Sequence, residues 1–246
     1  MQRGQSTDGS LAIKGPPQRA NKGSIEAFLS QSKALRERVA RQKRLLFAMD
    51  ATASREPTWA VACTLHDAMF DAIVGEEHLA VQLCYYRGIA DFYCSGWLSH
   101  PQVLRDTMAQ VRCLAGGTQI SRVLRQALSI ASDKNPIRAV VFIGDAVEEA
   151  AAHLESLAGQ CRLQRVPLFI FQEGHDPIAQ RCFKRLASLS GGAYARFDHT
   201  SPNRLRDLLN AVARYVSGGR QALTQASGES DKLLLKQLPG NPQCPD

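Results

Sequence analysis

Short apolar runs alternate with amphipathic helical segments from residue 45 to residue 216 of this 246-residue chain. This alternation limits the possible folds more than any other feature of the sequence. The pattern predicts strands at residues 45–49, 79–86, 89–94, 138–143, 167–171 and 193–197. It predicts helices at residues 59–74, 101–111, 119–131, 148–164, 177–190 and 202–216.

Strands separated by helices of this length are typical of a mostly parallel sheet covered on both faces. The runs at 79–86 and 89–94 are joined only through Arg87-Gly88, which is too tight for anything but a hairpin. We therefore expect an α/β fold: a doubly wound, mostly parallel six-stranded sheet with one antiparallel edge strand and helices on both faces, as in Rossmann-like domains.

The segments outside residues 43–216 have a different composition. Residues 1–23 are rich in Gln, Gly, Ser, Pro and Lys, which predicts a disordered basic arm. Residues 24–42 predict an amphipathic basic helix, which Ser24 can cap. Residues 217–246 are polar and Gly-rich apart from three consecutive leucines, which predicts a flexible C-terminal tail.

The basic character of the chain belongs to its first segment. Residues 1–44 contain ten Lys or Arg and three acids, which equals the whole net charge of +7. Such an arm can contact nucleic acid, anionic lipid or an acidic protein, or can simply be solvated. It contains a single aromatic residue, Phe28, so base stacking has little to use. No stretch approaches the ~18 apolar residues of a membrane span. We expect neither a nucleic acid nor a membrane as partner.

The seven cysteines are an odd number, with no C-x-x-C pair and no regular spacing. Five of them lie in apolar periodic segments, where a thiol behaves as a small hydrophobe: Cys63, Cys84, Cys113, Cys161 and Cys182. The pattern predicts free thiols and no zinc site. Together with the lack of a signal-peptide pattern, it predicts a cytoplasmic protein.

Polar side chains follow two predicted strands and one pair of glycines. Asp50, Thr52 and Ser54 come directly after the first strand, Thr118 follows Gly116-Gly117, and Asp145 follows the strand at 138–143. Ligands of open α/β sheets bind at the carboxyl ends of the strands. Two carboxylates and three hydroxyls are hard oxygen donors, which suit Mg²⁺ or Mn²⁺ and neutralise the charge of the ion. The sequence thus predicts a metal site made of these five residues.

Each element of this set also has a purely structural interpretation. Asp50 could cap the turn that follows it, Thr118 could cap the helix starting at Gln119, and Asp145 could cap the helix starting near Glu148. Each interpretation is reasonable alone. Three independent caps are a weaker explanation than one shared site, because they leave the order of the motifs along the chain unexplained.

The set resembles the metal-ion-dependent adhesion site of von Willebrand factor A (VWA) domains, whose signature is D-x-S-x-S, then a distant Thr, then a distant Asp. On that match, Asp50, Thr52 and Ser54 take the first motif, Thr118 the threonine and Asp145 the second aspartate. There are two departures: Thr52 replaces the usual first serine, and Asp145 lies in Gly-Asp-Ala instead of the more usual Thr-Asp-Gly. The resemblance covers residues 43–216 in order and includes the edge hairpin.

The resemblance implies a binding module of the intracellular bacterial type, with no turnover of its own. Mg²⁺ or Mn²⁺ held by the five residues would leave a position for an Asp or Glu carboxylate of a partner protein. Similar domains often work with ATPase or chaperone-like proteins, so an adaptor or assembly factor for an intracellular complex is the expected role.

The alternative is a phosphatase of the haloacid-dehalogenase type, in which Asp50 would be the nucleophile. Gly144-Asp145, followed by Glu148 and Glu149, imitates one motif of such enzymes. However, they use D-x-D, where the second Asp is a general acid, and Thr52 cannot perform that role.

Overall fold

A computed structural model of the protein describes residues 26–27, 29–33, 42–57, 59–60, 79–198 and 202–240. The chain divides into two compact units, residues 1–40 and residues 41–246. In the first unit the described residues are helical and belong to the predicted helix at 24–42, whereas the predicted arm at 1–23 lies outside the described residues. Of the predicted helix at 59–74, only residues 59–60 are described.

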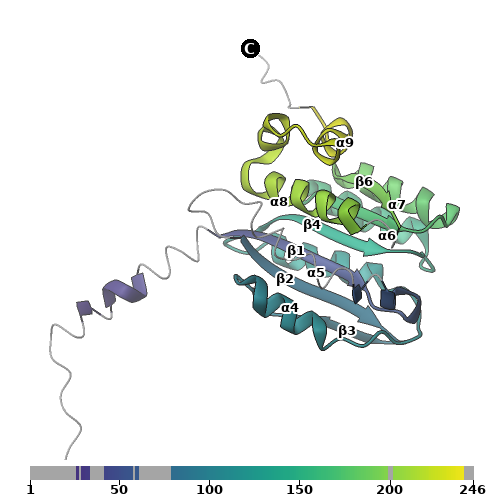
Figure 1. The fold of residues 1–246 in the computed structure, drawn as a ribbon, viewed down its shortest axis with the longest axis horizontal. Helices are drawn as coiled ribbons and strands as arrows, with labels where there is room; N and C mark the ends of the chain where they lie inside the picture. Colours follow the sequence, from purple (N-terminus) through teal and green to yellow (C-terminus); the bar gives the residue numbers. More distant parts are fainter. Residues whose placement is uncertain are drawn as a thin grey trace, which may run out of the picture. The chain divides into compact units, whose positions relative to one another are not determined.

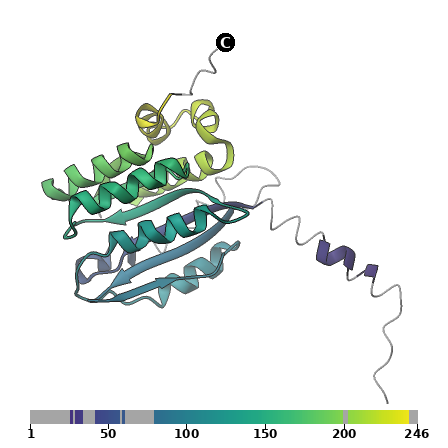
Figure 2. The ribbon, with the colours of Figure 1, turned by 180° about the vertical axis from the view of Figure 1, so that it is seen from behind.

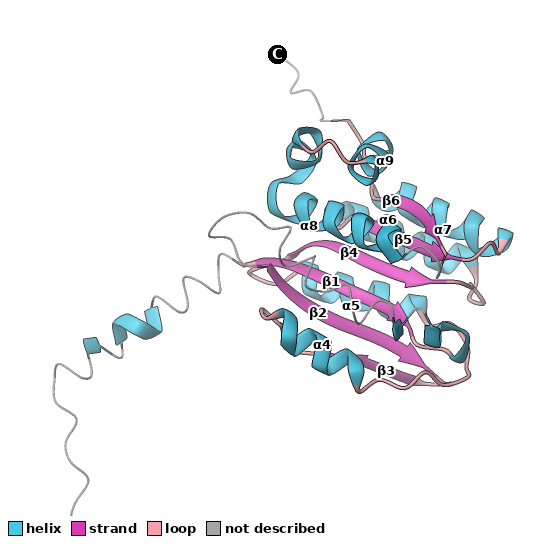
Figure 3. Ribbon diagram, viewed as in Figure 1, coloured by secondary structure: helices cyan, strands magenta, loops and turns pink. Residues whose placement is uncertain are grey.

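A six-stranded sheet forms the centre of the second unit (Figure 3). Its spatial order is β3-β2-β1-β4-β5-β6. The strands are β1 (Lys43–Asp50), β2 (Leu79–Arg87), β3 (Asp91–Cys94), β4 (Ile137–Gly144), β5 (Leu168–Glu173) and β6 (Ala193–Phe197). All neighbours are parallel except β2 and β3, which form the antiparallel edge hairpin. The predicted fold class is confirmed.

Helices cover both faces of the sheet (Figures 1 and 2). They are α4 (Pro101–Ala109), α5 (Ile120–Ala131), α6 (Ala151–Leu163), α7 (Pro177–Ser190), α8 (Pro202–Gln225) and α9 (Glu229–Gln237). Figure 1 shows α4 and α8 in front of the sheet, and Figure 2 shows α5, α6 and α7 on the opposite face.

The two faces have separate hydrophobic cores because successive strand side chains point to opposite sides. Leu45, Phe47 and Met49 of β1 belong to the core beneath α4 and α8. Leu46 and Ala48 belong to the core beneath α5, α6 and α7. All five side chains are fully buried. A central strand that is covered on both faces has no solvent-facing position, which explains why the centre of β1 is entirely apolar.

The C-terminal segment differs from the flexible tail expected at 217–246. Helix α8 kinks at Gly218 and Gly219 and continues to Gln225, and α9 follows it. Three leucines anchor this part in the core: Leu223, Leu234 and Leu238. The polar residues between them were misleading, because several of them bind the protein instead of solvent. The last residues, 241–246, lie outside the described part of the chain.

Two side chains of α9 show how this segment is held. Asp231 is 1% exposed and accepts two hydrogen bonds from Arg214 of α8, Nε to Oδ1 at 2.8 Å and Nη2 to Oδ2 at 2.7 Å. Gln237 pairs with the backbone of Tyr194 through both of its amide atoms, each at 2.9 Å. It therefore satisfies backbone groups of the edge strand β6, which would otherwise be free to pair with another chain.

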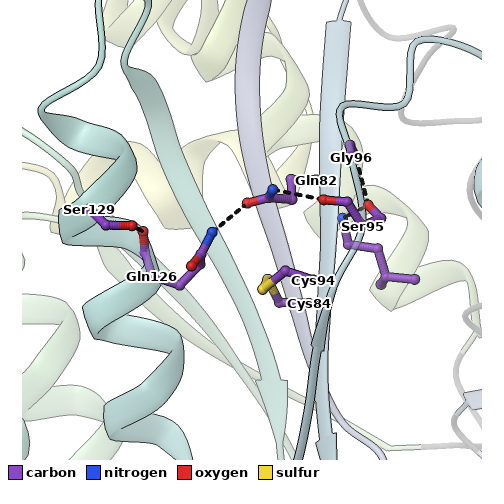
Figure 4. Close-up of a disulfide and its surroundings, with 8 residues drawn as sticks. Gln82, Cys84, Cys94, Ser95, Gly96, Gln126 and Ser129 are labelled. Atoms are coloured by element: carbon purple, nitrogen blue, oxygen red, sulfur yellow. Dashed lines mark hydrogen bonds between the residues drawn. A yellow bond between two sulfur atoms is a disulfide. The ribbon is translucent and has the colours of Figure 1, made fainter.

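A disulfide joins Cys84 to Cys94, which contradicts the prediction that all cysteines are free (Figure 4). The two residues lie directly opposite each other in the β2–β3 hairpin, with Cα atoms 4.3 Å apart. Sequence spacing predicted the hairpin but not which residues face each other across it. Cys113, Cys161 and Cys182 are free thiols, as predicted.

No helix in the described part of the chain has the length and apolar character needed to cross a membrane.

Candidate metal centre

Asp50 is the last residue of β1 and is held by two hydrogen bonds. Its Oδ1 accepts the backbone N–H of Thr52 at 2.7 Å. Its Oδ2 accepts the hydroxyl of Tyr86 at 3.1 Å. Tyr86 lies opposite Asp50 in the parallel register of β1 and β2, so the sheet itself sets this contact. Asp50 is only 1% exposed, and its carboxylate therefore has a fixed position.

Thr52 caps the short 3-10 helix at Ala53–Arg55, and Ser54 lies within that helix. Their hydroxyl oxygens are 3.3 Å apart. The Ser54 hydroxyl donates to Oδ2 of Asp145 at 2.9 Å. This bond links the loop after β1 to the loop after β4, across 91 positions of sequence.

Thr118 reaches the same place because the chain before it packs very closely. A Cβ at Gly116 would lie 1.9 Å from the carbonyl oxygen of Gly88, so only glycine fits there. Thr118 then forms a reciprocal pair with Glu148: the N–H of Thr118 donates to Oε2 of Glu148, and the N–H of Glu148 donates to Oγ1 of Thr118, each at 3.0 Å. The Thr118 loop is thereby tied to the loop that carries Asp145.

Glu148 and Glu149 were not predicted as site residues, and both have positioning roles. Glu149 accepts the N–H groups of Ile120 and Ser121, at the N-terminus of α5. A carboxylate at that end satisfies unpaired donors and complements the helix dipole. Helix α6 begins at Ala151, whereas the sequence had suggested a start near residue 148.

All five predicted residues line a single cavity of about 230 Å³, to which Glu148 also contributes. The alternative interpretation, in which Asp50, Thr118 and Asp145 only cap a turn or a helix, holds only in part. Asp50 does bind the turn after it. The cap residue of α5 is Gln119, and that of α6 is Ala150, so neither Thr118 nor Asp145 caps a helix.

The cavity is unlike a site made of clustered acids and histidines. Within the described residues, no group of three or more His, Cys, Asp or Glu side chains is arranged to hold a metal ion. Any cation here would depend on hydroxyl oxygens as well as carboxylates, which suits hard ions with water completing the shell.

Burial raises the pKa of Asp50 above its usual value, and the hydrogen bonds from Thr52 offset this in part. Burial also raises the pKa of Tyr86 well above its usual value, and the neighbouring Asp50 carboxylate adds to that effect. Tyr86 is therefore a neutral donor at any physiological pH, and its hydroxyl stabilises the ionised form of Asp50.

A buried cation lies under the first loop. The side chain of Arg55 is fully buried, and its Nη1 forms an ion pair with Oε2 of Glu173 at the end of β5. Its Nε and Nη2 have no hydrogen-bond partner among the described residues. This pair connects the Asp50–Ser54 loop to a third strand end, and no sequence motif pointed to it.

No model of a protein family matches the sequence, and no curated protein is similar enough to count as a match. Solved structures do match. A von Willebrand factor type A protein from Catenulispora acidiphila is 14% identical, with a TM-score of 0.59 over 72% of this chain and 43% of that one. The chain has the fold of a VWA domain. It spans less than half the length of the Catenulispora protein.

Two further VWA structures illustrate the range of proteins with this fold. Proximal thread matrix protein 1 from the mussel byssus, solved with a zinc-occupied metal-ion-dependent adhesion site, is 14% identical, with a TM-score of 0.57 over 70% of this chain and 46% of that one. The VWA domain of SpRpn10 is 14% identical, with a TM-score of 0.52 over 69% of this chain and 94% of that one. At these identities the likeness concerns the fold.

Proposed function

We propose that this VWA domain binds Mg²⁺ or Mn²⁺ through Asp50, Thr52, Ser54, Thr118 and Asp145, and uses the ion to bind an acidic side chain of another protein. The observation that carries the proposal is that these residues, from three loops distant in sequence, line one cavity. The zinc recorded in the mussel VWA protein supports a divalent ion at such a site.

The donor set fits this role chemically. Two carboxylates neutralise a divalent ion, and the hydroxyls of Thr52, Ser54 and Thr118 add neutral oxygens. An ion bound in this way keeps a position open for an anionic ligand from outside. The third carboxylate at the rim, Glu148, is held by Thr118 and orients that residue.

Apolar side chains beside the cavity favour a protein as the partner. Ile89 is 95% exposed at the tip of the hairpin, and Leu114 is 46% exposed. Their segments touch: the N–H of Gly88 donates to the carbonyl of Leu114, and the N–H of Leu114 donates to the carbonyl of Ala51 in the metal-site loop. A metal ion flanked by apolar side chains suits an Asp or Glu set in an apolar stretch of a partner protein.

The structure gives no support to Asp50 as a phosphatase nucleophile. Asp50 is buried, and both of its carboxylate oxygens accept hydrogen bonds from the protein. Position 52, where such an enzyme has its general acid, holds a threonine, which cannot perform that role. An adaptor role with an ATPase or chaperone-like partner remains our proposal for the biological setting.

The test is calorimetric titration of Mg²⁺ and Mn²⁺ into the wild type, Asp145→Ala and Asp50→Ala. We expect one site in the wild type and at least a tenfold loss of affinity in both variants. Asp207→Ala is the matched control, since it removes an exposed acid of α8 that is far from the cavity in sequence and does not line it. Equal binding by all four proteins would disprove the site.

Affinity capture with Mg²⁺ or with EDTA then tests the function. A partner retained only with metal, and lost with Asp145→Ala, would support the binding module. Release of phosphate from a generic phosphomonoester, abolished by Asp50→Asn, would instead identify an enzyme.

A further inference from the structure

A second and larger cavity, of about 690 Å³, lies at the edge of the sheet opposite the candidate metal centre. Its wall includes the carboxyl ends of α6 and α7 and the turns that lead from them to β5 and β6. Three arginines contribute to its wall: Arg162, Arg165 and Arg220. This cavity has no part in the proposed metal-dependent function.

The charge of this cavity is unbalanced. None of the residues that line it is acidic. The carboxyl ends of α6 and α7 each carry about half a negative charge from the helix dipole, against three full positive charges. Among the described residues, neither Arg162 nor Arg165 forms an ion pair or a side-chain hydrogen bond. Among the described residues, the wall of the cavity therefore carries a net positive charge.

Arg165 occupies a backbone conformation that normally belongs to glycine. Its φ is +59°, and it is the only residue other than glycine with a positive φ among those described. It follows the cap residue of α6, and the chain forms a Schellman turn there: the N–H of Arg165 donates to the carbonyl of Arg162, and that of Val166 to the carbonyl of Cys161.

Helix α7 ends beside the same cavity with the same turn, but with glycine. Gly191 has a φ of +77°, its N–H donates to the carbonyl of Ser188, and the N–H of Gly192 donates to that of Ala187. A side chain in the left-handed region is unfavourable, so glycine would also suit position 165 better for stability alone. The use of arginine at that position is explained if its side chain is needed in the cavity.

The other two arginines of the cavity have different surroundings. A Cβ at Gly191 would lie 1.7 Å from Nη1 of Arg162, so the absence of a side chain at position 191 makes room for that guanidinium group. Nη1 of Arg220 donates to the carbonyls of Leu235, Leu238 and Pro239, which fixes the wall formed by the chain after α9. Of the three guanidinium groups, that of Arg220 is held by hydrogen bonds, whereas the side chains of Arg162 and Arg165 are exposed and accessible to a ligand.

We propose that this cavity binds a small molecule carrying phosphate groups, held by the guanidinium groups of Arg162 and Arg165. The planar guanidinium group donates paired hydrogen bonds to phosphate oxygens. The volume is in the range of small-molecule sites and exceeds the needs of a lone ion. Tyr215, Pro167 and Leu238 supply an apolar wall for an organic portion of the ligand.

The test is titration of the full chain with pyrophosphate, AMP, ATP and citrate in the presence of EDTA, so that no metal ion can hold a phosphate elsewhere. We expect pyrophosphate or a nucleotide to bind more tightly than citrate. If the nucleotides bind more tightly than pyrophosphate, the ligand is an organic phosphate. If pyrophosphate binds as tightly as the nucleotides, the phosphate groups alone are recognised. Either result supports the proposal.

Arg165→Gly separates a role in binding from a role in folding. We expect this variant to bind the phosphate ligand about tenfold more weakly and, without ligand, to have a higher melting temperature because the strain is relieved. Arg162→Gln should weaken binding without that gain. Arg206→Gln is the matched control, since it removes an exposed arginine of α8 that does not line the cavity.

Three results would overturn the proposal. One is the absence of binding by pyrophosphate and both nucleotides at millimolar concentration. Another is citrate binding as tightly as the phosphates. The third is unchanged affinity in both Arg165→Gly and Arg162→Gln, or a lower melting temperature of Arg165→Gly.

Discussion

The hydroxyl of Tyr86 offers a sharp test of how the metal site is held. In Tyr86→Phe one oxygen atom is lost, while the ring keeps its place in the core against Phe142. The lost group donates to Oδ2 of Asp50 at 3.1 Å and is not itself one of the proposed metal ligands. Any effect on metal binding must therefore act through the position and ionisation of Asp50.

The expected loss can be worked out from this one bond. Removal of a partner that orients a metal ligand typically lowers metal affinity about 10- to 100-fold, or about 1.4–2.7 kcal/mol. Burial already raises the pKa of Asp50, and the loss of a donor raises it further, so protons compete better with the metal. We expect a loss of about tenfold at neutral pH and a larger loss as the pH falls.

The assay is calorimetric titration with Mn²⁺ over a series of pH values. Tyr194→Phe is the matched control, because its buried hydroxyl donates to Oε1 of Gln172 at 2.7 Å and Tyr194 does not line the metal cavity. Equal metal affinity of Tyr86→Phe and wild type would refute the reasoning, as would an equal loss in Tyr194→Phe.

Three further predictions concern other parts of the molecule. Burial raises the pKa of the Cys161 thiol to about 12, so its thiolate fraction at pH 8 should be about a thousandth that of an ordinary thiol. Its alkylation in the native protein should be slower by the same factor, and rapid labelling of Cys161, detected by mass spectrometry, would contradict this. Asp231→Asn should lower the free energy of unfolding in urea by about 2 kcal/mol, since it weakens the pair with the partly exposed Arg214, and an unchanged value would mean that α9 contributes little to stability. Ile89→Ser should weaken binding of the metal-dependent partner while metal affinity stays constant, whereas Leu163→Ser, equally apolar and 83% exposed, should change neither.

The strand ends were predictable because their pattern is local. A continuous apolar run followed by polar residues indicates a buried strand and the loop after it, and parallel strands bring such loops to one edge. Asp50 and Asp145 were placed on the same edge by this reasoning alone. The hydrogen bond that joins Ser54 to Asp145 is a consequence of that arrangement.

Contacts that depend on register or on burial could not be predicted in this way. Tyr86 faces Asp50, and Cys84 faces Cys94, only because of the residue-by-residue pairing of β2 with its neighbours. Sequence patterns locate strands to within a few residues, and a shift of one residue exchanges the two faces. Both contacts therefore needed the structure.

The C-terminal segment was misinterpreted for another reason. Its glycines and polar residues are typical of a mobile tail, but Asp231 accepts hydrogen bonds from Arg214, and Gln237 pairs with the backbone of Tyr194. Composition reports the average character of a segment and does not show which polar groups find partners. The leucines at 223, 234 and 238 were the signal that could have indicated a packed helix.

The most direct test of the central claim is anomalous scattering from crystals of the protein grown with Mn²⁺. We predict one strong peak in the cavity between Ser54, Thr118 and Asp145, within about 2–2.3 Å of their oxygen atoms. The peak should be absent from crystals of Asp145→Ala grown in the same way. A cavity without a peak at saturating Mn²⁺, or a peak held by other residues, would contradict a metal-binding role for these five side chains.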